Sequence, residues 1–236
     1  MINNYVSLDL ETSGLNPKID KIIEIGAVKV INGEIEGTYA TFVNPGIKLS
    51  TNTTKITGIT DNDLEYAPMI EKVIFRLSEF IGDLPLLGHS VLFDYSFLKK
   101  AAVNQKMRFE KQGVDTLRIA RKYLPELESR NLGFLCHYYG IPIKEHRALE
   151  DAKATHFLYQ KMCKLFLSKE MEKLAAFQLY DLIYRVKKES PITEHQKERL
   201  YELIHKHKLV VDYQVEYLTR NEASRYTDRI LSEYGR

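Results

Sequence analysis

The alternation of apolar and polar positions predicts strands at the start of the chain. Residues 5–11 alternate strictly, as expected for a strand that buries one face. Residues 22–31 form a longer Ile- and Val-rich run, typical of a largely buried strand. An Asn-Gly turn then leads to an antiparallel partner over residues 38–43. The first part of the chain is therefore expected to form a sheet.

Helical spacing of apolar residues replaces this alternation after residue 60. The predicted helices cover residues 68–81, 93–104, 115–123 and 131–139, with a short buried strand over 84–87. Residues 149–188 are expected to form one long helical region, broken near Ser168. Strands first, a short strand later and helices around them predict an α/β fold with a mixed sheet.

A change in composition near Lys187 to Pro191 indicates a linker. Two capping boxes follow it, Thr193 with Gln196 and Thr219 with Glu222, each in front of an amphipathic run. We therefore expect a small helical module at the end of the chain. The predicted boundaries are 1–168 for a catalytic domain, 169–190 for a helical connector and 191–236 for the module, whose role is open.

Composition limits the class of protein without naming a function. The chain has 236 residues, of which 44% are hydrophobic, which suits a globular domain with a small appendage. The formal net charge is +2, far below the strongly basic net charge of proteins that coat nucleic acids. No apolar run has the roughly 20 residues of a membrane span. Two cysteines form no disulfide framework, so we expect a cytoplasmic protein without membrane contact.

Asp9 and Glu11 are the first candidates for chemistry. They lie two residues apart on the first predicted strand, so both carboxylates leave the same face. Acids this close repel each other unless a cation lies between them, and Mg²⁺ and Mn²⁺ prefer such oxygen ligands. The alternative is a solvated strand end with two surface acids, and the spacing alone leaves both interpretations open.

Two further segments carry acids at predicted helix starts. Asp94 follows the short buried strand, and Asp151 lies in the first turn of a helix after a loop that contains His146. A histidine in such a loop suits proton abstraction near neutral pH. Taken singly, each acid is better explained by a favourable interaction with a helix dipole, and the histidine by a surface position.

Together these segments resemble the motifs of the DEDDh exonucleases, the DnaQ-like family that includes the proofreading epsilon subunit of bacterial DNA polymerase III. The matching segments are Asp9-Leu10-Glu11-Thr12-Ser13-Gly14, Ile22-Ile23-Glu24-Ile25-Gly26-Ala27, Ile56-Thr57-Gly58-Ile59-Thr60 as a loop, Gly88-His89-Ser90-Val91-Leu92-Phe93-Asp94 and His146-Arg147-Ala148-Leu149-Glu150-Asp151-Ala152. Their order and separations fit, and the resemblance covers about residues 4–167. Ser90 departs from the pattern, which often has Asn there.

The resemblance implies a ribonuclease H-like fold with a mixed five-stranded sheet flanked by helices, followed by the small all-α module. It assigns Asp9, Glu11, Asp94 and Asp151 as catalytic ligands of two divalent metal ions, Mg²⁺ or Mn²⁺, and His146 as the general base. It places the substrate beside five further residues: Thr12, Gly14, Ile59, His89 and Phe93. For His89, Ile59 and Phe93 a packing role is an equal or better alternative.

The expected activity is the metal-dependent removal of nucleoside 5′-monophosphates from 3′ ends of single-stranded DNA, in proofreading or repair. One alternative is a 3′–5′ exoribonuclease of the ribonuclease T or oligoribonuclease type. Another is a non-catalytic module that holds DNA ends or a polymerase, against which the full set of acids and His146 argues. A DNA polymerase is an expected partner by resemblance only.

Overall fold

A six-stranded mixed sheet forms the centre of the protein in the computed structural model, which describes residues 1–144, 146–167 and 175–235. The strands lie in the order β3-β2-β1-β4-β5-β6. Their bounds are β1 Tyr5–Thr12, β2 Ile22–Ile31, β3 Glu34–Phe42, β4 Leu86–Gly88, β5 Gln112–Asp115 and β6 Tyr180–Asp181. β1 pairs antiparallel with β2 and parallel with β4. The carboxyl ends of β1 and β4 therefore meet at one edge of the sheet.

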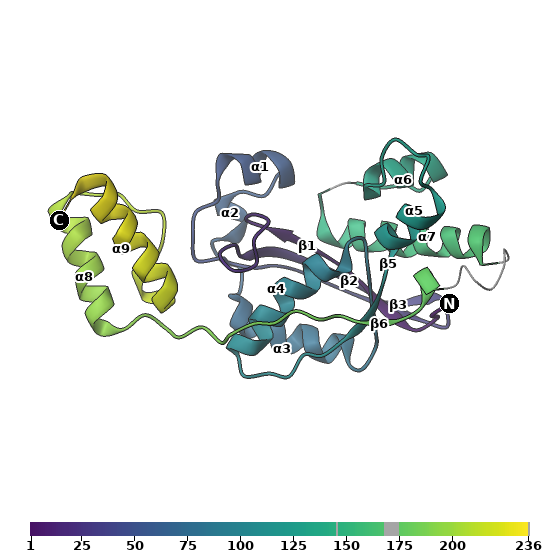
Figure 1. Cartoon of the computed structure of the whole chain (residues 1–236), viewed down its shortest axis with the longest axis horizontal. Helices are drawn as coiled ribbons and strands as arrows, with labels where there is room; N and C mark the ends of the chain where they lie inside the picture. Colours follow the sequence, from purple (N-terminus) through teal and green to yellow (C-terminus); the bar gives the residue numbers. More distant parts are fainter. Residues whose placement is uncertain (145, 168–174, 236) are drawn as a thin grey trace.

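Helices cover both faces of this sheet (Figure 1). Their bounds are α1 Thr51–Thr57, α2 Asp61–Leu64, α3 Ile70–Ile81, α4 Val91–Asn104, α5 Thr116–Tyr123, α6 Leu132–Tyr139, α7 Ala148–Phe166, α8 Glu194–Lys206 and α9 Arg220–Tyr234. Apolar side chains of α3 and α4 pack with Val6, Leu8 and Leu10 of β1 on one face. Those of α5, α6 and α7 pack on the other face. The alternation of β1 thus assigns its even-numbered residues to the α3–α4 side.

Local signals place several helix ends as predicted. Asp115 caps α5 by accepting from the N–H of Leu117, and Asn131 caps α6 by accepting from the N–H of Phe134. Residues 56–60, expected to be a loop, instead include the end of α1, which Gly58 terminates with a φ of 70°. A left-handed residue at this position suits glycine, which has no Cβ to oppose it.

Two expectations about the second half of the chain are wrong. The described sheet has six strands and not five, because β6 pairs antiparallel with β5. The helical region expected over 149–188 ends with α7 at Phe166, close to the predicted break, but its second part is not an α-helix, because residues 180–181 form β6 and residues 182–190 lie in neither a helix nor a strand. Residues 168–174 of the predicted helix and connector lie outside the described residues. Leu182 is buried in the α3–α4 core, so apolar spacing in this segment serves sheet packing rather than a helix face.

The C-terminal helices α8 and α9 form a small unit with its own apolar core, here called the C-terminal module. Its buried side chains include Ile192, Leu200, Leu203, Val215, Leu218, Ala223 and Ile230. Both predicted capping boxes are present, at Thr193 and Thr219. The module lies beyond the sheet on the side of α1 and α2 (Figure 1). Within the described ranges, no helix has the length and apolarity that crossing a membrane demands.

Candidate metal and active site

β1 presents Asp9 and Glu11 toward α7. Asp9 lies opposite Gly26 of β2, and Glu11 lies opposite Glu24. Ser7, on the same face two residues earlier, donates its hydroxyl to the carbonyl of Ala152 in α7, with a distance of 2.7 Å. The odd-numbered face of β1 is therefore covered by the first turns of α7, as the alternation requires.

Gly26 allows α7 to approach the sheet closely enough to deliver Asp151. A Cβ on Gly26 would lie 2.1 Å from the backbone carbon of Ala148 and 2.1 Å from the nitrogen of Leu149. With that close approach, one carboxylate oxygen each from Asp9, Glu11 and Asp151 lie within 4.8 Å of one another. Among the described residues, this is the group of acids and histidines close enough to hold a metal ion.

Asp94 reaches the same strand from its other side. It lies in the first turn of α4, directly after β4, and is 3% exposed. Its Oδ1 accepts a hydrogen bond from the backbone nitrogen of Leu10 at 3.2 Å, between the two acids of β1. Asp94 is outside the group of three carboxylates, although its charge acts directly on Asp9.

Burial and mutual repulsion make this cluster expensive to ionise without cations. Burial, followed by the charges of Asp94, Asp151 and Glu11, raises the pKa of Asp9 well above its usual range. Burial and the charges of Asp151 and Glu24 raise the pKa of Glu11 to about 7. Burial also raises the pKa of Asp94 well above its usual range. Hard divalent cations relieve such repulsion, so the donor set fits a metal of the Mg²⁺ or Mn²⁺ class.

His146 lies two residues before α7, in the loop bonded to Asp151 of the cluster. Its side chain is exposed, and its backbone adopts a φ of 64°. Its backbone nitrogen donates to Oδ2 of Asp151 at 2.9 Å. This bond ties the loop to the carboxylate and satisfies a donor that precedes the helix. The imidazole is thus attached to the acidic cluster through the main chain.

Glu24 and Arg147 support the start of α7, and of these Arg147 had no predicted role. Oε1 of Glu24 accepts from the guanidinium of Arg147 at 2.9 Å. Its Oε2 accepts from the backbone nitrogen of Ala148 at 3.3 Å. The buried carboxylate therefore holds the helix start against β2. The only sequence signal for Arg147 was its place in the matching segment from His146 to Ala152.

Thr12 ends β1, and Gly14 lies in the loop that leads from β1 to β2. The hydroxyl of Thr12 donates to the carbonyl of Gly14 at 2.7 Å. A Cβ on Gly14 would lie 2.6 Å from the carboxyl group of Asp20, so a larger residue here would have to displace that side chain. Thr12 is half-buried one residue after Glu11. Thr12 therefore directly follows a residue of the acidic cluster, and the contact of both residues with substrate stays a prediction.

The other three residues expected at the substrate pack within the protein. Ile59 is 2% exposed, in a small apolar cluster with Ile23. His89 binds the hydroxyl of Thr116 through Nδ1 at 2.9 Å and the carbonyl of Arg130 through Nε2 at 2.8 Å. These placements favour the packing alternative for Ile59 and His89, and their contact with substrate stays a prediction.

Phe93 and Ser90 lie at the start of α4. Phe93 is half-buried with its ring centroid 5.1 Å from that of Phe97. Ser90 has a φ of 78°, and its backbone nitrogen donates to Oδ1 of Asp115 at 2.9 Å. Asn tolerates the left-handed region better than most residues, which explains why Asn suits this position. Serine preserves the turn, and Asp94 is still delivered to β1.

A family model described as "Exonuclease" matches residues 6–159 of the chain. The match covers well over half of the sequence and contains every residue of the candidate site. The chain belongs to the exonuclease family. The site described above is therefore the acidic cluster of an exonuclease domain, and the C-terminal module lies outside the matched residues.

A curated relative is similar over about two thirds of this exonuclease. The PolC-type DNA polymerase III of Clostridium perfringens is 38% identical over 165 residues, which are 68% of this chain and 11% of the polymerase. The chain therefore spans about a ninth of the length of that relative. The similarity concerns one region of a much longer protein.

Solved structures share the fold at lower identity. Exonuclease X, in complex with 5′ overhanging duplex DNA, is 24% identical with a TM-score of 0.57, covering 72% of this chain and 97% of that one. The nuclease domain of 3'hExo, a DEDDh family member bound to rAMP, is 20% identical with a TM-score of 0.59, covering 70% and 93%. These likenesses confirm the ribonuclease H-like exonuclease fold that the motifs implied.

Proposed function

We propose that the protein is a metal-dependent 3′–5′ exonuclease that hydrolyses single-stranded DNA from its 3′ end and releases nucleoside 5′-monophosphates. The observation that carries the proposal is the convergence of carboxylates from β1 and α7 within 4.8 Å, with His146 bonded to the same cluster. The membership in the exonuclease family supports it.

Asp9, Glu11, Asp94 and Asp151 would hold two divalent ions, Mg²⁺ or Mn²⁺. Bound there, the ions supply charge neutralisation at the scissile phosphate and activation of water near neutral pH. Carboxylates are needed because these cations select hard oxygen ligands. The raised pKa values of Asp9 and Glu11 mean that cation binding also offsets the cost of ionising the cluster.

His146 would accept the proton from the attacking water. Its exposed side chain, on a loop beside the cluster, is accessible to solvent and to an incoming strand end. The hydrogen bond from its backbone to Asp151 keeps the base attached to the carboxylates. Proton transfer by a positioned side chain typically contributes about 10²- to 10⁴-fold to a rate.

Thr12 and Gly14 would lie beside the terminal nucleotide, because Thr12 ends β1 directly after Glu11 and Gly14 follows in the adjoining loop. Phe93 would contribute to the surface around this nucleotide, and Ile59 and His89 would shape that surface indirectly, through packing. The similarity to a PolC-type DNA polymerase III supports DNA as substrate and a polymerase as partner, in proofreading or repair. Action in the cytoplasm stays a prediction.

The test is a digestion of matched DNA and RNA oligonucleotides by the full chain with Mg²⁺, Mn²⁺ or EDTA. Substrates labelled at the 5′ end should yield a ladder shortening from the 3′ end, and 3′-labelled ones should release mononucleotides at once. Asp9→Asn should abolish both. Faster digestion of RNA would favour the exoribonuclease alternative. No release from any 3′ end with either metal would contradict the proposal and favour a binding module.

A further inference from the structure

The loop over residues 13–21 links the metal-binding strand to the rest of the protein. It follows directly after Glu11 and Thr12 and returns to β2. The backbone nitrogen of Ser13 donates to the carbonyl of Lys21 at 2.8 Å, and the backbone nitrogen of Lys21 donates to the hydroxyl of Ser13 at 3.0 Å. Two hydrogen bonds therefore join Lys21 to Ser13, the neighbour of Thr12.

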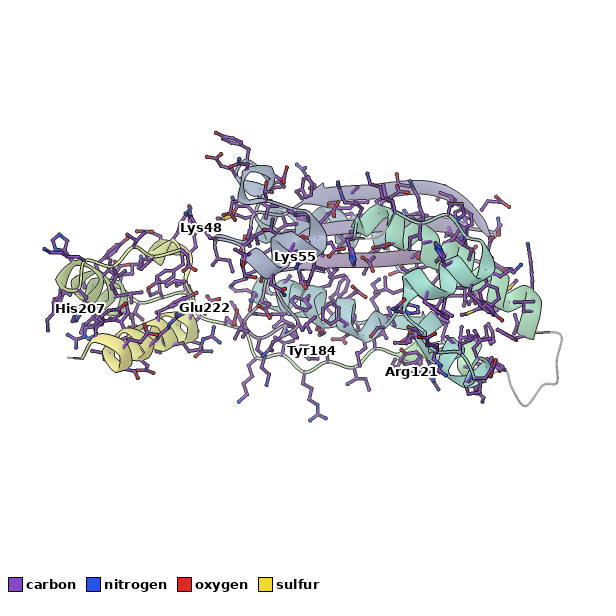
Figure 2. All side chains as sticks on the ribbon, turned by 90° about the horizontal axis from the view of Figure 1, so that it is seen from above. Lys48, Lys55, Arg121, Tyr184, His207 and Glu222 are labelled. Atoms are coloured by element: carbon purple, nitrogen blue, oxygen red, sulfur yellow. The ribbon has the colours of Figure 1, made fainter. Side chains whose placement is uncertain are left out.

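Lys21 is paired with Glu222 of the C-terminal module. The Lys21 Nζ lies 2.6 Å from Oε1 of Glu222, whose side chain is 7% exposed. Burial opposes ionisation of Glu222, yet the Lys21 ammonium and hydrogen bonds from Thr219 hold its pKa below the ordinary value. Glu222 thus remains charged in a nearly buried junction. Figure 2 shows it on the side of the module that is turned toward the sheet domain.

The charge of Glu222 is not needed for its other task. Its Oε2 accepts from the backbone nitrogen of Thr219 at 2.8 Å and so caps α9. In α8 the same capping box is made with Gln196, which carries no charge. Gln and Glu serve equally in this motif. The negative charge of Glu222 therefore has its specific partner in Lys21.

A second contact reaches the same loop from the connector. Lys100 of α4 donates to the carbonyl of Lys18 at 3.1 Å and lies 3.3 Å from Oε1 of Glu189. The backbone nitrogen of Glu189 donates to Oδ1 of Asn104 at 3.0 Å, which fixes the connector on α4. The loop is thus held at two residues. Lys100, which also pairs with Glu189 of the connector, binds the carbonyl of Lys18, and Glu222 of the module binds Lys21.

Backbone contacts keep the module in place at this junction. The backbone nitrogen of Lys48 donates to the carbonyl of Asp212 at 2.8 Å, and Ile47 forms an isolated antiparallel bridge with Tyr213. Lys48 and Glu222 both lie in the junction in Figure 2. The module is therefore held at two separate points, so Glu222 meets Lys21 in a defined geometry.

We propose that the C-terminal module is a clamp on the loop 13–21, in which Lys21 and Glu222 are positioning residues that hold Thr12 and Gly14 against the 3′-terminal nucleotide. The kinetic part of this inference rests on the proposed exonuclease function. The structural part, that the module orders the loop, does not.

The test compares Glu222→Gln with Glu233→Gln in the full chain. The first substitution keeps the cap of α9 and removes the ion pair, whereas Glu233 makes an exposed pair with Arg229 on the same helix. We expect Glu222→Gln to raise KM for single-stranded DNA about three- to tenfold with kcat within about twofold, because the loop that it loosens binds substrate and transition state alike. Hydrogen exchange of the metal-free protein should speed up at residues 13–21 and stay unchanged in α9.

Lys21→Met provides a second variant that leaves the cap of α9 untouched. It should reproduce both effects, and adding Glu222→Gln to it should change little more, because the two residues act through one contact. Behaviour of Glu222→Gln like the Glu233→Gln control would overturn the clamp. The clamp would also be overturned if Glu222→Gln speeded up hydrogen exchange of the loop in an active enzyme but left its KM unchanged. If no form of the chain degrades nucleic acid, the proposed function fails and the exchange data alone decide the clamp.

Discussion

A Cβ on Gly26 would lie 2.1 Å from the backbone carbon of Ala148, a distance that no packed side chain can occupy. Gly26 lies opposite Asp9 in the sheet, and Ala148 begins the helix that carries Asp151. The absence of one methyl group therefore fixes how closely two parts of the acidic cluster approach. Overpacking at such a contact costs about 1–3 kcal/mol.

Gly26→Ala should therefore push α7 away from β2 and separate Asp151 from Asp9. We expect an unfolding free energy lower by about 1–3 kcal/mol in urea titration and a loss of nuclease activity larger than the loss of stability explains. Gly37→Ala is the matched control, because its Cβ would lie 3.8 Å from Phe80 in ordinary contact. Equal effects of the two substitutions would contradict this account.

The acidic cluster predicts an unusual dependence of stability on pH. Folding raises the pKa of Glu11 from 4.5 to about 7, so its protonated form favours the folded state. This contribution is complete below pH 4.5 and is lost as the pH rises through about 7. The metal-free protein should thus lose stability between about pH 5 and 8, and Glu11→Gln should flatten that decline in thermal unfolding.

Divalent metal ions should restore the stability that the metal-free protein loses as the pH rises. A ligand at 100 times its Kd adds about 2.7 kcal/mol to the unfolding free energy, so Mg²⁺ or Mn²⁺ should raise Tm at about pH 8. The rise should shrink toward about pH 6, where protons compete for Glu11, and it should be smaller in Glu11→Gln. A metal-induced rise that is the same at both pH values and in both proteins would exclude this site as its origin.

His146→Ala tests the general base separately from metal binding. Turnover should fall about 10²- to 10⁴-fold. The metal-induced rise in Tm should stay nearly unchanged, because His146 is not one of the proposed metal ligands. His195→Ala, an exposed histidine on α8, is the control. Full activity of His146→Ala across the neutral pH range would refute the assigned role.

Glu24→Gln tests the support of α7. The substitution removes a buried charge that accepts from Arg147 and from the Ala148 backbone, and such bonds contribute about 1.5–3 kcal/mol. Stability and activity should both fall, as urea titration and digestion assays would show. Glu150→Gln is the control, since Glu150 pairs with Lys153 at a partly exposed position. A Glu24→Gln protein as stable and active as this control would show that the bond is dispensable.

The local pattern determined much of this protein. Alternation along β1 placed Asp9 and Glu11 on one face, because side chains of a strand alternate by geometry. Asp115, Asn131, Thr193 and Thr219 act as the caps that their types predict, since a cap is satisfied within one turn. The motifs also indicated the family, and all four acids, Asp9, Glu11, Asp94 and Asp151, could be named before any contact was known.

Tertiary structure decided what depends on partners distant in sequence. Leu182 and its neighbours have spacing that suits a helix, but Leu182, directly after β6, donates its backbone N–H to the carbonyl of Lys111 and buries its side chain against β5. The same holds for the pair of Lys21 with Glu222 and for the contact of Gly26 with Ala148. Sequence spacing fixes which side chains share a face, whereas only the packed chain determines what that face meets.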